Sequence, residues 1–491
     1  MKVKFYPSEA YGETAAPPSK SVGQRLLICA ALCAGTSTID NIGGADDIAA
    51  VIDCLRVLGA EIDLRDGRAV VRGMDSGAEA GGTIRARTGC VSNHVAGASE
   101  SDCGSDKPTG ESGDEGRITA DCGESGAALR FLIPVCLGLG KNAVFCGKPR
   151  LFSRPLGVYE EICRKQSLDF SLSDDSLEVG GQLKPGEFSL PGNISSQFVS
   201  GLLFALPLLG GDSIIRLMHP VESRPYIDMT IEALAKFGVE VSWEDDLTIR
   251  IAGRQTYTAA DVTNEGDWSG AAYLEAFSRA GNNIKITGLR EDSLQGDRVY
   301  REYFDRITGG RRVEEARAGA ALPGGASAGT EAEIRAGDEY GLETEVRAEK
   351  TGRTGKVSTA DSALLPEIDI SDCPDLGPVL MALGAANNGV CLTGTKRLKY
   401  KESDRASAMK EELAKLGAEV EVGENRVVVY SGIRQPESPL RAHKDHRVVM
   451  ALSLLLAKTG GSIEGAEAVI KSFPDFFDRL ESLGINLIRE Y

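Results

Sequence analysis

The chain has 491 residues and a formal net charge of −17. Its length predicts about two to four domains, with enough residues to bury sizeable cores. The acidic balance argues against general binding to nucleic acid or to an anionic membrane, because both need a broad basic surface, but it permits a small anion in a local basic pocket.

The eleven cysteines and four histidines do not support a metal site, because no two cysteines form a CxxC pair. We therefore do not expect a zinc site. Residues 1–12 lack the apolar segment of a signal peptide, and apolar runs such as 201–209 are too short to span a bilayer. These features predict a cytoplasmic protein without nucleic-acid or membrane partners, and we expect a monomer.

A pattern recurs along the chain, in which an apolar helical run ends near a glycine and a short β-branched strand follows. Three of its five intervals are about 71 residues and the other two are longer. Several helices also end in apolar-Gly-apolar, where glycine suits the residue after the helix. The pattern predicts an α/β fold of six units, each ordered helix, strand, helix, strand, strand. It recurs at Gly35, Gly140, Gly211, Gly281, Gly389 and Gly461.

The two longer intervals contain segments of biased composition, at about residues 76–116 and about residues 309–362. Both are rich in glycine and small or charged residues, and neither has a sustained apolar period. This composition predicts flexible surface insertions. Cys90, His94 and Cys103 fall in the first of them, and we assign them no role.

Basic side chains begin several of the predicted helices, although the helix N-terminus is itself electropositive. One such arginine is usually a solvated side chain, but a repeated arrangement predicts a bound polyanion, since free N–H groups and cations together attract phosphate or carboxylate. We expect Ser403 to cap the helix that begins near Arg405, and Asp46 and Asp47 to start another helix as caps. The cations are Lys20 with Arg25, Arg130, Arg405 and Arg447, and a fifth helix opens with Ser195, Ser196 and Gln197.

Nine stretches in this order resemble the enolpyruvyl transferases, and specifically the branch that acts on shikimate 3-phosphate. They cover nearly the whole chain, and the set is far more specific than any one motif. The stretches are PPSKSVGQR (17–25), GESGAALR (123–130), GKPRLFSRPL (147–156), GNISSQF (192–198), ESRPYID (222–228), CPDLGPVL (373–380), KYKESDR (399–405), KDHRVVMAL (444–452) and KSFPDFFD (471–478).

The resemblance implies two similar domains, each of three βαβαββ units, forming an inverse α/β barrel fold with the active site in the interdomain cleft. Residues 1–18 plus 264–491 would form one domain and residues 19–263 the other. It also implies transfer of the enolpyruvyl group of phosphoenolpyruvate to the 5-hydroxyl of shikimate 3-phosphate, with release of phosphate, by addition and elimination. This reaction belongs to the shikimate pathway of aromatic amino acid biosynthesis and needs no cofactor.

The resemblance assigns catalysis to Asp375 as the general base, Glu402 near the methylene carbon and Lys20 near the leaving group. From its sequence context alone, Asp375 could equally be a helix N-cap, and Arg130 could be structural. The implied contacts of shikimate 3-phosphate are Lys20, Ser21, Arg25, Ser195, Ser196, Gln197, Ser223, Tyr226, Asp375, Arg397 and Lys401. Those of phosphoenolpyruvate are Lys20, Gly126, Arg154, Gln197, Arg405, His446, Arg447 and Lys471.

Ala127 departs from the family pattern, which has Thr or Ser at that position, so one hydroxyl is missing near the phosphoenolpyruvate site. Two alternatives stay open. One is the sister enzyme that transfers enolpyruvyl to UDP-N-acetylglucosamine, which usually carries a cysteine on a mobile loop, whereas Cys146 here is predicted to lie in a strand. The other is a non-catalytic binding protein of the same fold.

Overall fold

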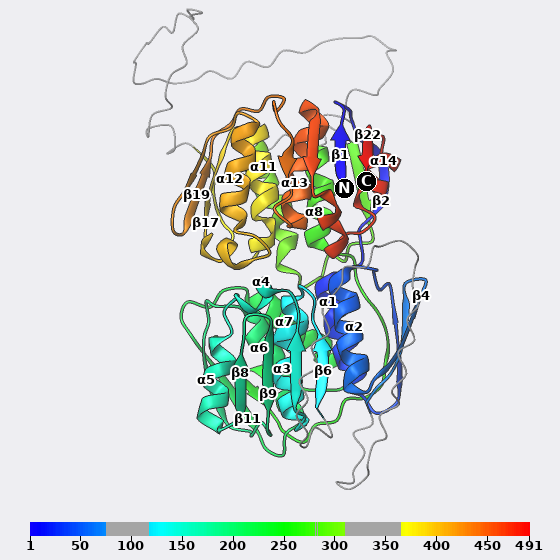
Figure 1. Cartoon of the computed structure of the whole chain (residues 1–491), viewed down its shortest axis with the longest axis vertical. Coiled ribbons are helices and arrows are strands. Elements are labelled where there is room, and N and C mark those ends of the chain that lie inside the picture. The colour runs from blue at the N-terminus through cyan, green and yellow to red at the C-terminus, as the bar shows by residue number, and fades with distance from the viewer. Residues whose placement is uncertain (75–116, 280, 282, 310–364) are drawn as a thin grey trace, which may run out of the picture.

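The computed structural model describes residues 1–74, 117–279, 281, 283–309 and 365–491. The two predicted insertions, with Cys90, His94 and Cys103, therefore lie outside the described residues, apart from Gly309 at the end of a helix. The described chain forms two halves, one above the other in Figure 1, and both termini lie in the upper half.

The lower half, from Lys20 to Thr263, contains three units of the predicted order. Its helices are α1 (Lys20–Ala31), α2 (Asp46–Leu58), α3 (Gly126–Gly138), α4 (Pro149–Phe152), α5 (Gly157–Gln166), α6 (Ser196–Ala205), η1 (Leu206–Leu208) and α7 (Arg224–Lys236). Its strands are β3 (Thr36–Asp40), β4 (Glu61–Arg65), β5 (Arg68–Arg72), β6 (Ile118–Asp121), β7 (Ala143–Cys146), β8 (Asp169–Leu172), β9 (Ser176–Gly180), β10 (Glu187–Pro191), β11 (Ser213–Met218), β12 (Val241–Trp243), β13 (Thr248–Ile251) and β14 (Asp261–Thr263).

The upper half combines residues 2–15 with residues 268–490. Its helices are α8 (Trp268–Arg279), η2 (Gly296–Val299), α9 (Tyr300–Thr308), η4 (Pro374–Leu376), α11 (Gly377–Ala386), η5 (Lys396–Tyr400), α12 (Arg405–Lys415), α13 (His446–Thr459), η6 (Ala466–Lys471) and α14 (Phe476–Ser482). Its strands are β1 (Lys2–Phe5), β2 (Tyr11–Ala15), β15 (Asn283–Thr287), β16 (Glu367–Asp369), β17 (Val390–Thr393), β18 (Val420–Val422), β19 (Arg426–Val429), β20 (Leu440–Arg441), β21 (Gly461–Glu464) and β22 (Leu487–Glu490).

The sheets repeat the same topology, which confirms the predicted α/β repeats. In each four-stranded sheet of the described residues, the first two strands are parallel and the remaining pairs are antiparallel, as in β6–β7–β9–β8. The last unit differs in one respect, because its third strand is β1 from the start of the chain, which pairs with β21 and β22. The N-terminal strand thus closes the final repeat.

Two separate hydrophobic cores stabilise the halves. One consists of buried residues between Val22 and Tyr257, and the other of residues from Val3 to Ala10 and from Trp268 to Leu487. The predicted domain boundaries after residues 18 and 263 fall between these cores, and they stay a prediction. No helix of the described residues is long and apolar enough to cross a membrane.

The central helices of each half are buried on nearly every face because their sequences are apolar all round, as in α3 and α11. The outer helices are amphipathic. Helix α2, for example, ends before Gly59, in an apolar-Gly-apolar sequence of the predicted kind, and the φ of 113° at Gly59 is readily adopted only by glycine. The N-termini of these apolar central helices lie beside the interface between the two halves, which we call the seam.

Candidate active site

A cavity of about 430 Å³ lies between the two halves, and most of the predicted site residues line it. Arg447 and Lys471 are not part of its lining, but they contact its carboxylates: Arg447 Nη2 lies 3.6 Å from Asp375 Oδ2, and Lys471 Nζ lies 4.0 Å from Glu402 Oε1. The predicted residues that line the cavity are Lys20, Ser21, Arg25, Gly126, Arg154, Ser195, Ser196, Gln197, Ser223, Tyr226, Asp375, Arg397, Lys401, Glu402, Arg405 and His446.

Helix N-termini from both halves supply these side chains. Lys20 is the first residue of α1, Gly126 of α3, Ser196 of α6, Arg405 of α12 and His446 of α13. Since unpaired N–H groups and the helix dipole make each start electropositive, their convergence creates a site for anions. The residues that cap these starts with a side-chain oxygen are Ser19, Ser125, Ser195, Asp404 and Asp445.

The cap of α12 is Asp404, so the prediction of Ser403 was wrong. The Asp404 carboxylate accepts the N–H of Ser407 at 3.2 Å. Ser403 instead donates its hydroxyl to Asp445 Oδ2 at 2.9 Å in a buried contact. A carboxylate one residue closer to the helix reaches the orphan N–H, which frees the serine for the buried acceptor.

Arg405 is the centre of the upper wall and is 1% exposed. Its guanidinium bonds three carboxylates: Asp375 Oδ1 at 2.7 Å, Glu402 Oε2 at 2.8 Å and Asp445 Oδ2 at 2.9 Å. Burial opposes the charge of Arg405, but these three anions outweigh burial and raise its pKa. The planar donors of arginine suit such multiple recognition of carboxylates.

Asp445 is a site residue that the sequence reasoning missed. It lies within the KDHRVVMAL stretch, and its position immediately before a helix was the available signal. Its side chain caps α13 through the N–H of Arg447 at 2.9 Å and also bonds Arg405. One carboxylate thus fixes both the helix start and the buried guanidinium.

Asp375 and Glu402 are both held as anions. Burial would raise the pKa of Asp375, but Lys401, whose Nζ lies 3.1 Å from Oδ1, together with Arg405 and Arg447, lowers it well below its usual range. For Glu402, burial is likewise outweighed, chiefly by Arg405 and Lys471, so its pKa is also lowered well below normal. Asp375 makes no side-chain contact that caps a helix, because its carboxylate faces these cations.

Lys20 lies on the lower wall and pairs with Asp47, whose Oδ2 is 2.7 Å from Nζ. Burial opposes the charge of Lys20, but Asp47 and then Glu402 outweigh it and raise its pKa. Asp46 begins α2 as predicted, but neither Asp46 nor Asp47 is a helix cap, since Ala45 occupies the cap position and no side chain caps this helix. No local signal distinguishes Asp47 from an ordinary acid in a first helical turn, because its partner lies on another helix.

Arg25 is fixed within the lower half. It donates to Thr230 Oγ1 at 2.8 Å, to the carbonyl of Ser21 at 2.6 Å and to the carbonyl of Tyr226 at 3.0 Å. Burial lowers its pKa to about 10. These contacts join α1 to the start of α7, where Ser223 and Tyr226 face the cavity.

Gly126 lies against two guanidinium groups. A Cβ added there would meet Arg130 Nη1 at 2.8 Å and Arg154 Nη1 at 2.9 Å, so the absence of a side chain admits both cations. Ala127 beside it lines the cavity with a methyl group where the family pattern has a hydroxyl. The Nε atoms of Arg130 and Arg154 have no hydrogen-bond partner among the described residues.

Arg130 lines the cavity and is also anchored behind it. Its guanidinium donates to Gln197 Oε1 at 3.0 Å and to the carbonyl of Pro155 at 3.2 Å, and lies 5.4 Å from the ring centroid of Phe198. Burial lowers its pKa to about 10. Arg130 thus holds Gln197 in place while contributing positive charge to the site.

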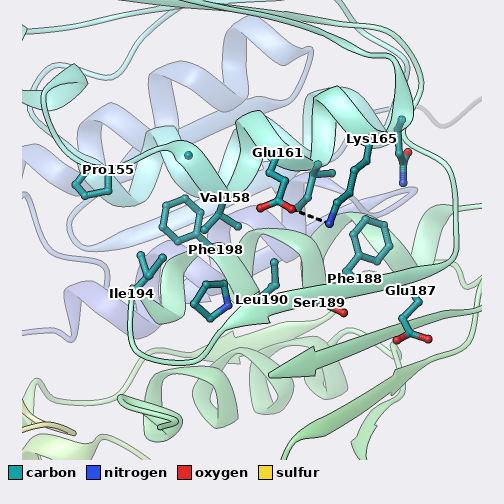
Figure 2. A pocket seen from close by; sticks show the side chains of 14 residues that line it. Pro155, Val158, Glu161, Lys165, Glu187, Phe188, Ser189, Leu190, Ile194 and Phe198 are labelled. Atoms are coloured by element: carbon teal, nitrogen blue, oxygen red, sulfur yellow. Dashed lines mark ion pairs between the residues drawn. The ribbon is translucent and has the colours of Figure 1, made fainter. Parts of the chain in front are cut away.

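A second, mainly apolar cavity of about 280 Å³ lies between α5 and the edge strand β10. Figure 2 shows Val158, Ile194 and Phe198 facing it, with the Glu161–Lys165 ion pair of 2.7 Å at one side. Pro155, Ile194 and Phe198 line both cavities, so they form the wall between them. This wall carries the contacts of Arg130.

His446 and Arg447 begin α13 with ring and guanidinium nitrogens that have no hydrogen-bond partner among the described residues. Burial, and then the charges of Lys20 and Arg447, lowers the pKa of His446 well below its usual value, so the ring is neutral. Arg447 Nε and Nη1 have no partner in the described part of the chain, although its guanidinium lies 5.3 Å from the ring centroid of Tyr273. Buried donors without partners in the protein are available to a ligand at this site.

The two halves meet through specific polar contacts at the edge of the cavity. Arg397 Nε lies 2.8 Å from Glu222 Oε2, and Asp372 Oδ1 accepts the N–H of Ser223 at 2.6 Å. Arg150 donates to the carbonyl of Glu402. The positions of site residues in one half therefore depend on contacts with the other.

The fold matches solved structures over almost the entire chain. It superposes on EPSP synthase from Acinetobacter baumannii with a TM-score of 0.64 at 20% identity, covering 99% of this chain and 100% of that one. It superposes equally on the enolpyruvyl transferase NikO from Streptomyces tendae, with a TM-score of 0.64 at 15% identity and coverage of 99% and 98%. The chain therefore has the enolpyruvyl transferase fold.

Sequence comparison shows to which family of enolpyruvyl transferases the chain belongs. The family model described as EPSP synthase (3-phosphoshikimate 1-carboxyvinyltransferase) matches residues 6–88 and 94–480. A 3-phosphoshikimate 1-carboxyvinyltransferase of Clostridium kluyveri is 35% identical over 487 residues, covering 98% of this chain and 97% of the relative. The chain belongs to the EPSP synthase family.

Proposed function

We propose that the chain catalyses transfer of the enolpyruvyl group from phosphoenolpyruvate to the 5-hydroxyl of shikimate 3-phosphate, with release of phosphate. The observation that carries this proposal is one cavity in which cations from both halves surround two ionised carboxylates. Such a site fits two polyanionic substrates and a reaction that moves protons. The family match supports the same activity.

In this proposal the lower wall holds shikimate 3-phosphate. Its hydroxyls and amide, from Ser195, Ser196, Gln197 and Ser223, suit a phosphate and a polyol. Ser21, Arg25 and Tyr226 complete this wall, and Lys401 and Arg397 reach it from the upper half.

The phosphoenolpyruvate would lie against the remaining cations. Arg154, Arg405 and Arg447 can grip its carboxylate or phosphate with paired donors, as arginine does for planar anions. The free donors of Arg154 and Arg447 support this placement. The other groups proposed to contact it are Lys20, Gly126, Gln197, His446 and Lys471.

Proton transfer is assigned to Asp375 and Glu402. Asp375 accepts the proton of the attacking hydroxyl. Glu402, protonated once substrate anions occupy the cations that hold it, delivers that proton to the methylene carbon in the addition step and takes one back from the methyl group in the elimination step. The proton held by Asp375 then leaves with the departing phosphate, so both carboxyl groups return to their starting states. Lys20 neutralises charge on the departing phosphate. Both carboxylates keep low pKa values while they hold the cations, so substrate anions that compete for those cations would raise both pKa values toward the working range.

The direct test is release of inorganic phosphate from the purified chain with both substrates and no added metal. We expect release to require phosphoenolpyruvate together with shikimate 3-phosphate. Release with UDP-N-acetylglucosamine in place of shikimate 3-phosphate would refute the assignment, and no release with either acceptor would favour a non-catalytic protein of this fold. The family match does not favour these alternatives.

We also propose that the protein works in the cytoplasm. The support is that every cysteine in the described residues is unpaired, as is typical of reducing compartments. The expected monomer stays a prediction.

A further inference from the structure

Asp297 is a buried carboxylate at the seam that the proposed mechanism does not use. It lies on η2 of the upper half and is 3% exposed. Its Oδ2 accepts the hydroxyl of Tyr226, which belongs to α7 of the lower half, at 3.1 Å. Its Oδ1 has no hydrogen-bond partner among the described residues. A buried carboxylate with one oxygen unsatisfied is costly if ionised.

The packing around this contact is tight. A Cβ added to Gly296 would lie 3.0 Å from Pro225, so η2 rests directly on the first turn of α7. The carbonyl of Tyr226 is fixed by Arg25 Nη2 at 3.0 Å. The backbone of Tyr226 is therefore held from the lower half, while its hydroxyl is held by Asp297 from the upper half, and Tyr226 lines the substrate cavity.

The charges facing Asp297 oppose its ionisation. Burial and then Asp375 on η4 raise its pKa to about 7, with a further contribution from Asp267 before α8, while Arg447 on α13 and the Tyr226 hydroxyl act in the opposite direction. Cys373 also faces it, and burial, with Asp297 next, raises the pKa of that thiol. Asp297 can therefore change its protonation near neutral pH.

The protonation of Asp297 decides what Tyr226 can offer a ligand. A tyrosine hydroxyl has one proton to donate and can also accept. If Asp297 is ionised, the tyrosine hydroxyl donates its hydrogen bond to the carboxylate, and only the oxygen lone pairs remain for a ligand. If Asp297 is protonated, it donates to the tyrosine oxygen, and the hydroxyl proton becomes free to turn toward a bound anion.

We propose that Asp297, as the neutral acid, is a positioning residue that donates to Tyr226 and so directs the Tyr226 hydroxyl proton toward the phosphate of the bound substrate. The inference rests on the proposed function, since it acts on shikimate 3-phosphate. Asp297 takes its proton from solvent as the anion binds, and it does not contact the substrate itself.

The test compares the pH dependence of KM for shikimate 3-phosphate in the wild type and in Asp297→Asn. Because only the protonated fraction binds well, a group with a pKa of about 7 makes the wild-type KM rise about tenfold from about pH 6 to about pH 8. Asparagine donates at every pH, so Asp297→Asn loses this rise while kcat stays within about twofold. Ionisation of the substrate itself affects the KM of every variant equally. The test therefore uses the difference between the KM–pH profiles of the wild type and Asp297→Asn.

Two variants separate positioning from general damage. In a Tyr226→Phe background, adding Asp297→Asn changes nothing further, because the hydroxyl that it serves is gone. Glu275→Gln is the matched control, since Glu275 Oε2 also accepts a tyrosine hydroxyl, that of Tyr300 at 3.1 Å, but lies away from the cavity. This control keeps the wild-type profile.

Binding calorimetry gives a second measurement that does not need turnover. At about pH 8, in two buffers of different ionisation enthalpy, the wild type should take up about one more proton than Asp297→Asn when shikimate 3-phosphate binds. Equal uptake, identical KM profiles, or an effect that persists in the Tyr226→Phe background would each overturn the inference. Absence of phosphate release by the wild type would instead refute the proposed function.

Discussion

The two walls of the cavity use the same repeated unit for different chemistry. The lower wall presents hydroxyls, an amide and cations, with Asp47 already paired to Lys20. The upper wall presents Asp375 and Glu402, held by the buried Arg405. The difference teaches that the fold supplies a set of helix N-termini, whereas the side chains placed there decide whether a wall binds or moves protons.

The largest expected effect comes from Asp375→Asn, which tests whether the upper wall moves protons. Loss of the proposed general base should lower kcat by about 10²- to 10⁴-fold, the usual contribution of a positioned acid–base group. The KM for shikimate 3-phosphate should change far less. Steady-state phosphate release measures both quantities, and a variant with normal kcat and raised KM would move Asp375 to the binding role.

Arg405→Met tests whether the upper wall needs its buried cation. It leaves three carboxylates without their shared partner, and breaking a buried ion pair in this way typically costs about 3–5 kcal/mol in the free energy of unfolding. Urea unfolding measures the loss. Arg216→Met is the control, because its pair with Glu187 is solvent-exposed and such pairs are worth about 0–1 kcal/mol. Equal losses in both variants would contradict the assigned role.

Ser196→Ala tests the lower wall. A hydrogen bond to a charged group is worth about 1.5–3 kcal/mol, so loss of the hydroxyl should raise the KM for shikimate 3-phosphate by about 10- to 100-fold. The kcat should stay nearly unchanged, in contrast to Asp375→Asn. Ser173→Ala, in an exposed turn of the same half, should alter neither constant. If Ser196→Ala lowered kcat without raising KM, the assignment of binding to the lower wall and proton transfer to the upper wall would be contradicted.

The last comparison is the opposite pH response of the carboxylates. Asp375 and Glu402 have lowered pKa values, so the stability they contribute is present above about pH 4 and is lost as pH falls through their folded pKa values. Asp297 has a raised pKa, so its contribution is full below about pH 4 and is lost as pH rises toward its folded pKa of about 7. The free energy of unfolding in urea should therefore differ increasingly between the wild type and Asp297→Asn as the pH rises from about 4 to about 7. If the two free energies change in parallel with pH, the raised pKa of Asp297 is contradicted.

The repeats could be predicted from the sequence because hydrophobic periodicity and glycines at helix ends are local signals. The ends of α2 and α7 and the strands after them follow the predicted order. The source of the third strand in the last unit was not predictable from the repeat, because β1 pairs with β21 across almost the whole chain.

The predicted residues that line the cavity are those that a motif carries. The residues that the sequence did not single out are those whose partners are distant along the chain. Asp47 is in an ordinary helix start until Lys20 is placed 2.7 Å away. Asp445 lies beside two predicted residues, yet its role depends on Arg405, 40 positions earlier. Asp297 has no motif, and only its contact with Tyr226 across the seam identifies it.

By itself, the sequence determined the α/β repeats, the helix starts that carry cations and, through its motifs, the family. These follow from the order of residues along the chain and from short spacings within one element. The tertiary structure decided which charges neutralise one another, which carboxylates are held ionised and which residues meet across the seam. Coulomb energies and desolvation depend on distance and burial in space, and neither is encoded by the separation of two residues along the chain.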